Sequence, residues 1–157
     1  AKLKQLRKKI DIIIGSLYVD RSKKKKYNSI YFYSDNQEKI FHKHILTPLG
    51  EKNPFFNSLN ELINKTFYNG AIDFNEGSSI NSIHLHDKKF ALAICYEATR
   101  DESFANKPSY MIAISNNAWF ATSIQSTLQN LLLKYYARKH NTIILHSANY
   151  GKESIIY

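Results

Sequence analysis

Cysteine occurs once in the 157-residue sequence, at Cys95 within the stretch ALAICYEATR (91–100). The residues from Phe90 to Ile94 are apolar, and Tyr96 and Glu97 follow the cysteine, so the thiol lies where a buried strand gives way to a polar turn. Ligands of open α/β sheets bind beyond the carboxyl ends of strands. A thiol there can be a nucleophile, with the next amide N–H directed at the oxygen of an attacked carbonyl. The alternative is a small buried side chain, the role of most free cysteines.

A catalytic thiol needs a neighbouring base or cation, and histidine is the usual partner. The sequence has six histidines, and two pairs of them, His42 with His44 and His84 with His86, are spaced to lie on one face of a strand. No third and fourth ligand with zinc spacing accompanies either pair. We therefore favour surface or strand-pairing roles for these histidines over a metal site.

The composition is that of a globular domain, with 43% hydrophobic residues, eleven Tyr and nine Phe. A single cysteine excludes an internal disulfide bond. Much of the net charge of +9 comes from the Lys run 23–26 and the first residues. A solvated hairpin tip is favoured for this run over a nucleic-acid or phospholipid site. The chain opens without Met or an apolar leader and closes on a strand-like segment, so we expect a piece of a longer protein.

The pattern along the chain predicts strands and helices that alternate, as in α/β layered folds. The predicted strands cover 10–19, 27–34, the two arms of a hairpin within 84–95, 108–115 and two segments within 141–157. The predicted helices cover 1–9, 58–68 and 122–141. Extended chain passes into a Pro/Gly turn over 38–52, and 116–120 is a loop. Several strands are continuous apolar runs, which predicts burial on both faces.

The long helix predicted over 122–141 has apolar residues three and four apart, which predicts one buried face. These residues are Ile124, Leu128, Leu131, Leu132, Tyr135 and Tyr136. Ser123 or Thr122 is expected to cap the helix.

Four ordered motifs resemble the nitrilase, or carbon–nitrogen hydrolase, superfamily and, within it, the apolipoprotein N-acyltransferase family. They are FHKHILTPLGE (41–51), ICYE (94–97), SNNAWF (115–120) and SANYGKESIIY (147–157). The resemblance extends from about Ile12 to the last residue. It implies a nitrilase-like α-β-β-α sandwich that is incomplete, with residues 1–157 forming part of a carbon–nitrogen hydrolase domain.

The resemblance implies a set of catalytic residues in this chain. Cys95 matches the nucleophile and Lys43 the catalytic lysine. Glu51 matches the second glutamate of the lysine segment, where it would orient Lys43 or bind the amine substrate; the alternative is an exposed loop carboxylate. The general-base glutamate of the superfamily precedes the segment IDIIIG (10–15). No acidic residue lies before Ile10, so we expect negligible turnover by this chain alone.

Further residues near the site follow from the same resemblance. Tyr96 and Glu97 flank the nucleophile, and Asn117 stands where the family usually has Asp. Trp119, with Phe120, would border a groove for acyl chains. The pair Phe55 and Phe56 is expected either at that groove or in the core.

The family activity implies acyl transfer through a thioester on Cys95, a reaction that needs no metal or organic cofactor. The donor would be a phospholipid, and the acceptor the N-terminal amine of a diacylglyceryl-cysteine apolipoprotein. The resemblance further implies a membrane surface but no nucleic acid as partner, in a protein of the inner membrane of a Gram-negative bacterium with this domain on the periplasmic side.

Two other functions remain open. One is a soluble nitrilase-superfamily amidase or hydrolase, in which water resolves the thioester. TPLGE (47–51) and NNAWF (116–120) favour the transferase over this hydrolase. The other is a non-catalytic basic module that binds anionic lipid or nucleic acid through Lys23–Lys26.

Overall fold

The structure is a computed structural model of the 157-residue chain. It describes residues 6–34, 37–48, 50–52, 74–118 and 123–150, and the backbone of 154–156. Several expectations lie outside these residues: the helix predicted over 58–68, the cap at Thr122, and the roles of Phe55, Phe56, Trp119 and Phe120. The helix predicted over 1–9 is described only from Leu6, whose carbonyl accepts hydrogen bonds from Lys9 and Ile10 in a single helical turn.

The first three strands form an antiparallel sheet in the order β1-β2-β3. They are β1 (Ile12–Asp20), β2 (Lys25–Tyr33) and β3 (Glu38–His42). The predicted hairpin is therefore confirmed. Its turn is held by the Asp20 carboxylate, which accepts hydrogen bonds from the backbone N–H groups of Ser22 and Lys23 at 3.0 and 3.1 Å. The Lys run is divided between this turn and the start of β2.

The other five strands form a mixed sheet in the order β4-β5-β6-β7-β8. They are β4 (Asn81–Leu85), β5 (Lys88–Ile94), β6 (Tyr110–Ser115), β7 (Ile143–Ala148) and β8 (Ser154–Ile156). The central strands β5, β6 and β7 are parallel, whereas β4 and β8 pair antiparallel at the edges. The carboxyl ends of the three central strands therefore meet at one edge of the sheet, which is where Cys95 follows β5.

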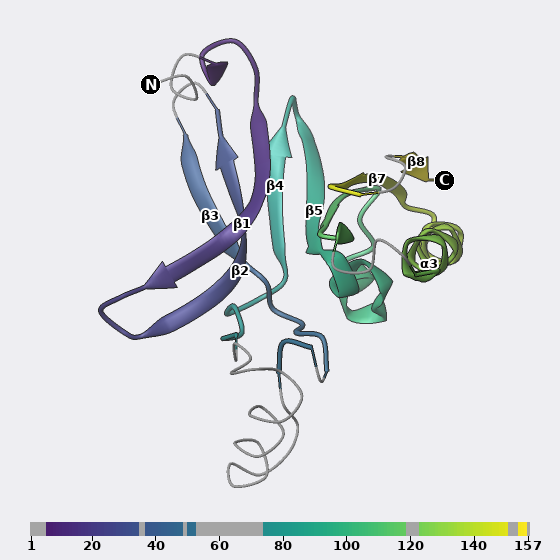
Figure 1. Ribbon diagram of the computed structural model, residues 1–157. Coiled ribbons are helices and arrows are strands. Elements are labelled where there is room, and N and C mark those ends of the chain that lie inside the picture. Colours follow the sequence, from purple (N-terminus) through teal and green to yellow (C-terminus); the bar gives the residue numbers. More distant parts are fainter. Residues whose placement is uncertain are drawn as a thin grey trace, which may run out of the picture.

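The five-stranded sheet is covered on both faces (Figure 1). One face packs on the three-stranded sheet through buried Ile30, Phe32, Ile83 and Leu92. The other face packs on the helix α3 (Gln125–His140), with Ala113, Leu133 and Ile144 fully buried. The predicted burial of both faces is confirmed, and the described residues provide three layers, α-β-β, of the expected four-layer sandwich.

The orientation of α3 differs from the expectation. The helix buries Gln129, Leu133 and Ala137, which recur every four residues. Five of the six apolar side chains expected inside are between 45% and 72% exposed: Ile124, Leu128, Leu131, Leu132 and Tyr135. The sheet beneath α3 presents small side chains, among them Ala93 and Ala113. A helix that approaches such a surface closely buries a narrow stripe of small or slender residues, and polar contacts made by Gln129 add to this preference.

The ends of α3 also differ slightly from the expected 122–141. The N-cap residue is Ile124, and no side chain caps the helix there. Ser123 accepts a hydrogen bond from the Gln125 N–H at 3.2 Å instead of capping the helix. At the other end, Asn141 adopts a left-handed conformation with φ 50°, as is common after a helix C-terminus.

Candidate active site

Cys95 lies at a sharp turn between β5 and the short 3-10 helix η1 (Cys95–Thr99). Its φ angle is 53°, in the left-handed region that side chains other than glycine rarely adopt. A conformation of this kind costs about 1–3 kcal/mol and persists where the surrounding structure enforces it. The Cys95 side chain is half-buried, which is unlike a fully buried core thiol. A partly exposed nucleophile on a strained strand-to-helix turn is the arrangement of a nucleophile elbow.

Glu97 joins this turn to the segment that carries Lys43. Its carboxylate is 5% exposed and accepts hydrogen bonds from the backbone N–H groups of His44 at 2.7 Å and Ile45 at 2.9 Å. The other oxygen accepts a hydrogen bond from the Ile94 N–H at 2.8 Å. Burial raises the pKa of Glu97, although these hydrogen bonds and the charge of Lys43 oppose the rise. The motifs ICYE and FHKHI are therefore in direct contact.

Lys43 is fully buried and paired with Glu51. Its ammonium group lies 2.5 Å from a Glu51 carboxylate oxygen and 3.3 Å from the Thr47 hydroxyl oxygen. Burial alone would raise the pKa of Glu51, but the charge and hydrogen bond of Lys43 and the hydrogen bonds from Thr47 lower it overall. The alternative of Glu51 as an exposed loop carboxylate is wrong, because its side chain is only 13% exposed.

Two further residues hold this ion pair in place. The Asn28 side-chain amide donates a hydrogen bond to the second carboxylate oxygen of Glu51, and the Asn28 carbonyl accepts one from the Lys43 N–H at 2.8 Å. Gly77 donates its N–H to the Lys43 carbonyl at 2.7 Å. A β-carbon at Gly77 would lie 2.4 Å from the His42 carbonyl oxygen, so only glycine fits. Asn28 lies in the strand predicted over 27–34, but its contact with Glu51 depends on a turn that spacing does not reveal.

The histidine pairs make structural contacts instead of sharing a strand face. His42 ends β3 and bonds the Ser29 hydroxyl at 2.8 Å, whereas His44 lies beyond the strand and bonds the Gly77 carbonyl at 2.7 Å. His84 is exposed on β4, and His86 lies in the following turn with φ 45°. The expected shared faces were therefore wrong. Among the described residues, no group of three or more His, Cys, Asp or Glu side chains could hold a metal ion.

The remaining candidates lie around the elbow. Tyr96 accepts a hydrogen bond at its hydroxyl from Arg100 at 3.1 Å. Asn117 is buried and donates its side-chain amide to the Gln129 carbonyl oxygen at 2.8 Å. Gln129 in turn contacts the Cys95 sulfur. Sequence reasoning missed Gln129, because the narrow stripe that it shares with Leu133 and Ala137 is revealed only by the structure.

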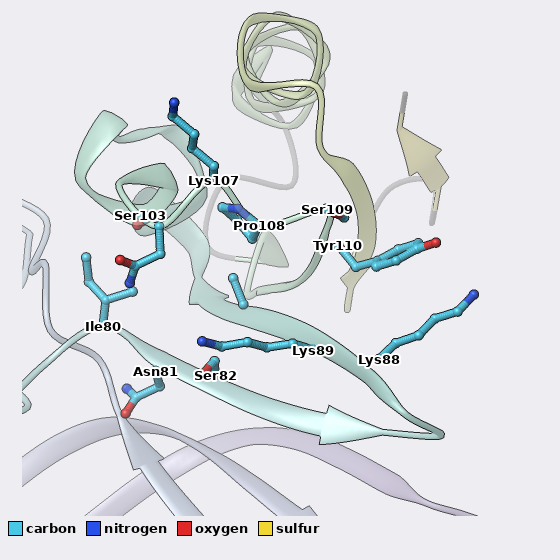
Figure 2. A pocket seen from close by; sticks show the side chains of 12 residues that line it. Ile80, Asn81, Ser82, Lys88, Lys89, Ser103, Lys107, Pro108, Ser109 and Tyr110 are labelled. Atoms are coloured by element: carbon cyan, nitrogen blue, oxygen red, sulfur yellow. The ribbon is translucent and has the colours of Figure 1, made fainter.

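The cavities formed by the described residues include two with polar and charged walls. The larger, of about 390 Å³, adjoins the polar residues behind the elbow. Its walls are Asn117, Ser126, Thr127, Asn130, Leu131, Lys134, His146 and Tyr150. The smaller, of about 280 Å³, lies beside Lys88 and Lys89 at the start of β5, below Pro108–Tyr110 (Figure 2). None of the candidate catalytic residues lines this cavity.

Solved structures define the class of the fold. The chain superposes on yeast Nit3, described as a member of branch 10 of the nitrilase superfamily, with a TM-score of 0.63 and 18% identity over 93% of this chain and 48% of that one. It also superposes on the glutamine-dependent NAD+ synthetase of Acinetobacter baumannii, with a TM-score of 0.66 and 15% identity over 99% of this chain and 27% of that one. The fold is therefore that of the nitrilase, or carbon–nitrogen hydrolase, superfamily.

Sequence relatives narrow this class and confirm the resemblance seen in the motifs. The chain is similar to the apolipoprotein N-acyltransferases over almost its whole length. It is 41% identical over 155 residues to that of Wolinella succinogenes, covering 98% of this chain and 37% of the relative. It is 40% identical over 154 residues to that of Campylobacter jejuni, covering 98% and 33%.

The chain thus spans about a third of the length of the curated relatives that it matches. No protein-family model matches the chain. In the part that the structure describes, no helix has the length and apolar character needed to cross a membrane.

Proposed function

We propose that residues 1–157 are part of the carbon–nitrogen hydrolase domain of an apolipoprotein N-acyltransferase. The whole protein moves a fatty acyl chain from a phospholipid to the N-terminal amine of a diacylglyceryl-cysteine apolipoprotein. The observation that carries the proposal is the contact of Glu97 with the segment after Lys43, which joins the Cys95 elbow to the lysine segment. The identity of 41% with a named acyltransferase supports the choice of reaction.

The first half-reaction forms a thioester. The Cys95 thiol loses its proton to a base, and the sulfur attacks the ester carbonyl of the phospholipid. The carbon–oxygen bond then breaks, the lysophospholipid leaves with a proton, and the acyl group stays on the sulfur. Lys43 and the Tyr96 N–H stabilise the negative oxygen of the tetrahedral intermediate.

The second half-reaction regenerates the thiol. The apolipoprotein amine attacks the thioester, a carbon–nitrogen bond forms, and the carbon–sulfur bond breaks. The Cys95 sulfur recovers one proton and the attacking amine loses one. Glu51 orients Lys43 through the buried ion pair. The general base is a glutamate outside this chain, so the chain alone has negligible turnover.

The partners and location follow from this reaction. Because the acyl donor is a lipid, the protein works at a membrane surface, and we place it in the inner membrane of a Gram-negative bacterium with this domain on the periplasmic side. Trp119 is proposed to border the groove for acyl chains.

The test measures the product with the whole protein, a phospholipid with a labelled acyl chain, and a diacylglyceryl-cysteine peptide. We expect an N-acylated peptide from wild type and at least a thousandfold less from Cys95→Ser. The double variant Lys43→Met with Glu51→Gln, which removes both charges of the buried pair together, is expected to lose activity but to fold. If free fatty acid is released without the peptide as fast as the phospholipid is consumed with it, the protein is a hydrolase instead.

A further inference from the structure

Gln129 is a buried polar residue on the face of α3 that meets the sheet. It is 5% exposed and shares that face with Leu133 and Ala137. A buried amide group is costly unless its oxygen and its N–H groups are hydrogen-bonded. Every polar atom of the Gln129 side chain has a partner, and one of these partners is the sulfur of Cys95.

The partners of Gln129 fix which way its amide faces. The carbonyl oxygen accepts a hydrogen bond from the Asn117 side-chain amide at 2.8 Å. The NH2 group donates one hydrogen to the Ser115 hydroxyl oxygen at 2.9 Å and the other to the Cys95 sulfur at 3.6 Å. If the amide were reversed, its NH2 group would face the NH2 group of Asn117. The network therefore directs an N–H group at the thiol.

His146 completes the network on the side away from the thiol. Its Nε2 atom lies 3.1 Å from the Ser115 hydroxyl oxygen, and burial lowers the pKa of His146. A neutral ring can accept the Ser115 hydrogen at Nε2, which leaves the Ser115 oxygen free to accept from Gln129. Each hydrogen bond in the series from His146 on β7 to Cys95 on η1 therefore has one donor and one acceptor.

We propose that Gln129 is a positioning residue for Cys95: its N–H group orients the sulfur and stabilises the thiolate. This role rests on the proposed function of Cys95 as the nucleophile. It is distinct from the action of the charged groups around the elbow, which are Lys43, Glu97 and Arg100. An N–H donor is effective at this position because Gln129 is already held by Asn117 and Ser115, so no side-chain ordering is needed when the thiol ionises.

The measurement is the rate of alkylation of the thiol by iodoacetamide as a function of pH. Cys95 is the only cysteine of the 157-residue chain, and peptide mapping by mass spectrometry follows the alkylation of this one site in the whole protein. In Gln129→Leu we expect the midpoint of the pH profile to rise by about one unit, the effect of one hydrogen bond to a charged group. The alkylation rate at pH 7 then falls about threefold, because the greater nucleophilicity of a more basic thiolate partly offsets the loss of thiolate.

Two further variants separate the N–H group from general packing. Gln129→Glu keeps the shape and still accepts from Asn117, but it places an oxygen beside the sulfur, so we expect a larger rise in the midpoint. Asn130→Leu removes the neighbouring amide of α3, whose buried carbonyl oxygen has no hydrogen-bond partner among the described residues, and should leave the midpoint unchanged. An unchanged or lowered midpoint in a folded Gln129 variant overturns the proposal.

The wild-type protein provides a test that needs no substitution. The NMR signals of the Gln129 side-chain NH2 group should shift with the same pH midpoint as the alkylation rate. Signals that do not follow the thiol overturn the proposal even if the variants fail to fold. Neither measurement uses phospholipid, so a failure of acyl transfer with a confirmed thiol effect would contradict only the proposed function.

Discussion

The ion pair of Lys43 and Glu51 makes the stability of the fold depend on pH. The pKa of Glu51 in the folded protein lies below its ordinary value of 4.5. A carboxyl group of this kind stabilises the fold at pH values above the ordinary pKa, and the stabilisation is lost as the pH falls through the lower folded value. Protonation of Glu51 also leaves the buried ammonium group of Lys43 without a counter-charge.

Replacement of Glu51 by Gln should therefore lower the free energy of unfolding at pH 7 by about 3 kcal/mol. As the pH falls below 4.5, the free energy of unfolding of wild type should decrease toward that of the variant. Urea unfolding across this range is the measurement. The half-buried His42 and the buried His146, whose pKa values desolvation lowers, affect both proteins equally. Parallel stability curves for the two proteins would contradict the account.

Glu97 provides a second prediction at the scale of single residues. Its carboxylate accepts three backbone hydrogen bonds, and the NH2 group of a glutamine cannot accept any of them. We expect Glu97→Gln to lower the free energy of unfolding by about 1–3 kcal/mol. The matched control is Glu102→Gln, an exposed glutamate paired with Arg100, which should change stability by less than about 0.5 kcal/mol. Equal effects of the two substitutions would exclude a connecting role for Glu97.

At the scale of elements, the orientation of α3 is the point where sequence and structure disagree. Leu133 is fully buried, whereas its neighbour Leu132 is 47% exposed. Leu133→Ala should lower the free energy of unfolding by about 2–5 kcal/mol because it leaves a cavity against the sheet. Leu132→Ala should change stability by less than about 0.5 kcal/mol. Thermal unfolding of both variants checks the orientation of α3. A larger loss of stability in Leu132→Ala than in Leu133→Ala would contradict it and would favour the buried face expected from the sequence.

The loop before β4 gives a prediction about backbone packing. Gly77 meets the His42 carbonyl so closely that a methyl group there must displace the end of β3, next to Lys43. Gly77→Ala should destabilise the fold by about 1–3 kcal/mol and slow alkylation of Cys95. Gly50→Ala is the control, since its methyl group would make only an ordinary contact with Thr47 at 3.6 Å. Urea unfolding followed by circular dichroism measures the stability of the two variants. An unchanged stability of Gly77→Ala would contradict the account, because it would show that the end of β3 can shift freely.

For the molecule as a whole, strand positions and the elbow were predictable because both depend on local pattern. The apolar run before Cys95 and the His86–Asp87 turn determine β4 and β5 without reference to distant residues. The contacts that build the site were not predictable in this way. The Glu97 carboxylate reaches N–H groups more than fifty residues earlier in the chain, and only the packing of the two sheets brings them together.

The orientation of α3 failed for a related physical reason. Apolar periodicity identified a broad stripe, but the sheet surface beneath the helix includes small residues such as Ala93 and Ala113. Which stripe is buried depends on the shape of that surface, and on the polar network that Gln129 joins. Neither is visible in the helix sequence alone.

The most direct test of the central claim maps the acyl group on the protein. The whole protein is incubated with a phospholipid whose acyl chain carries a mass label, without an amine acceptor, and its peptides are analysed by mass spectrometry. The account predicts one acyl group on the peptide that contains Cys95, released by neutral hydroxylamine and absent from Cys95→Ser. A labelled acyl group on another residue, or N-acyl transfer that persists in Cys95→Ser, would contradict it.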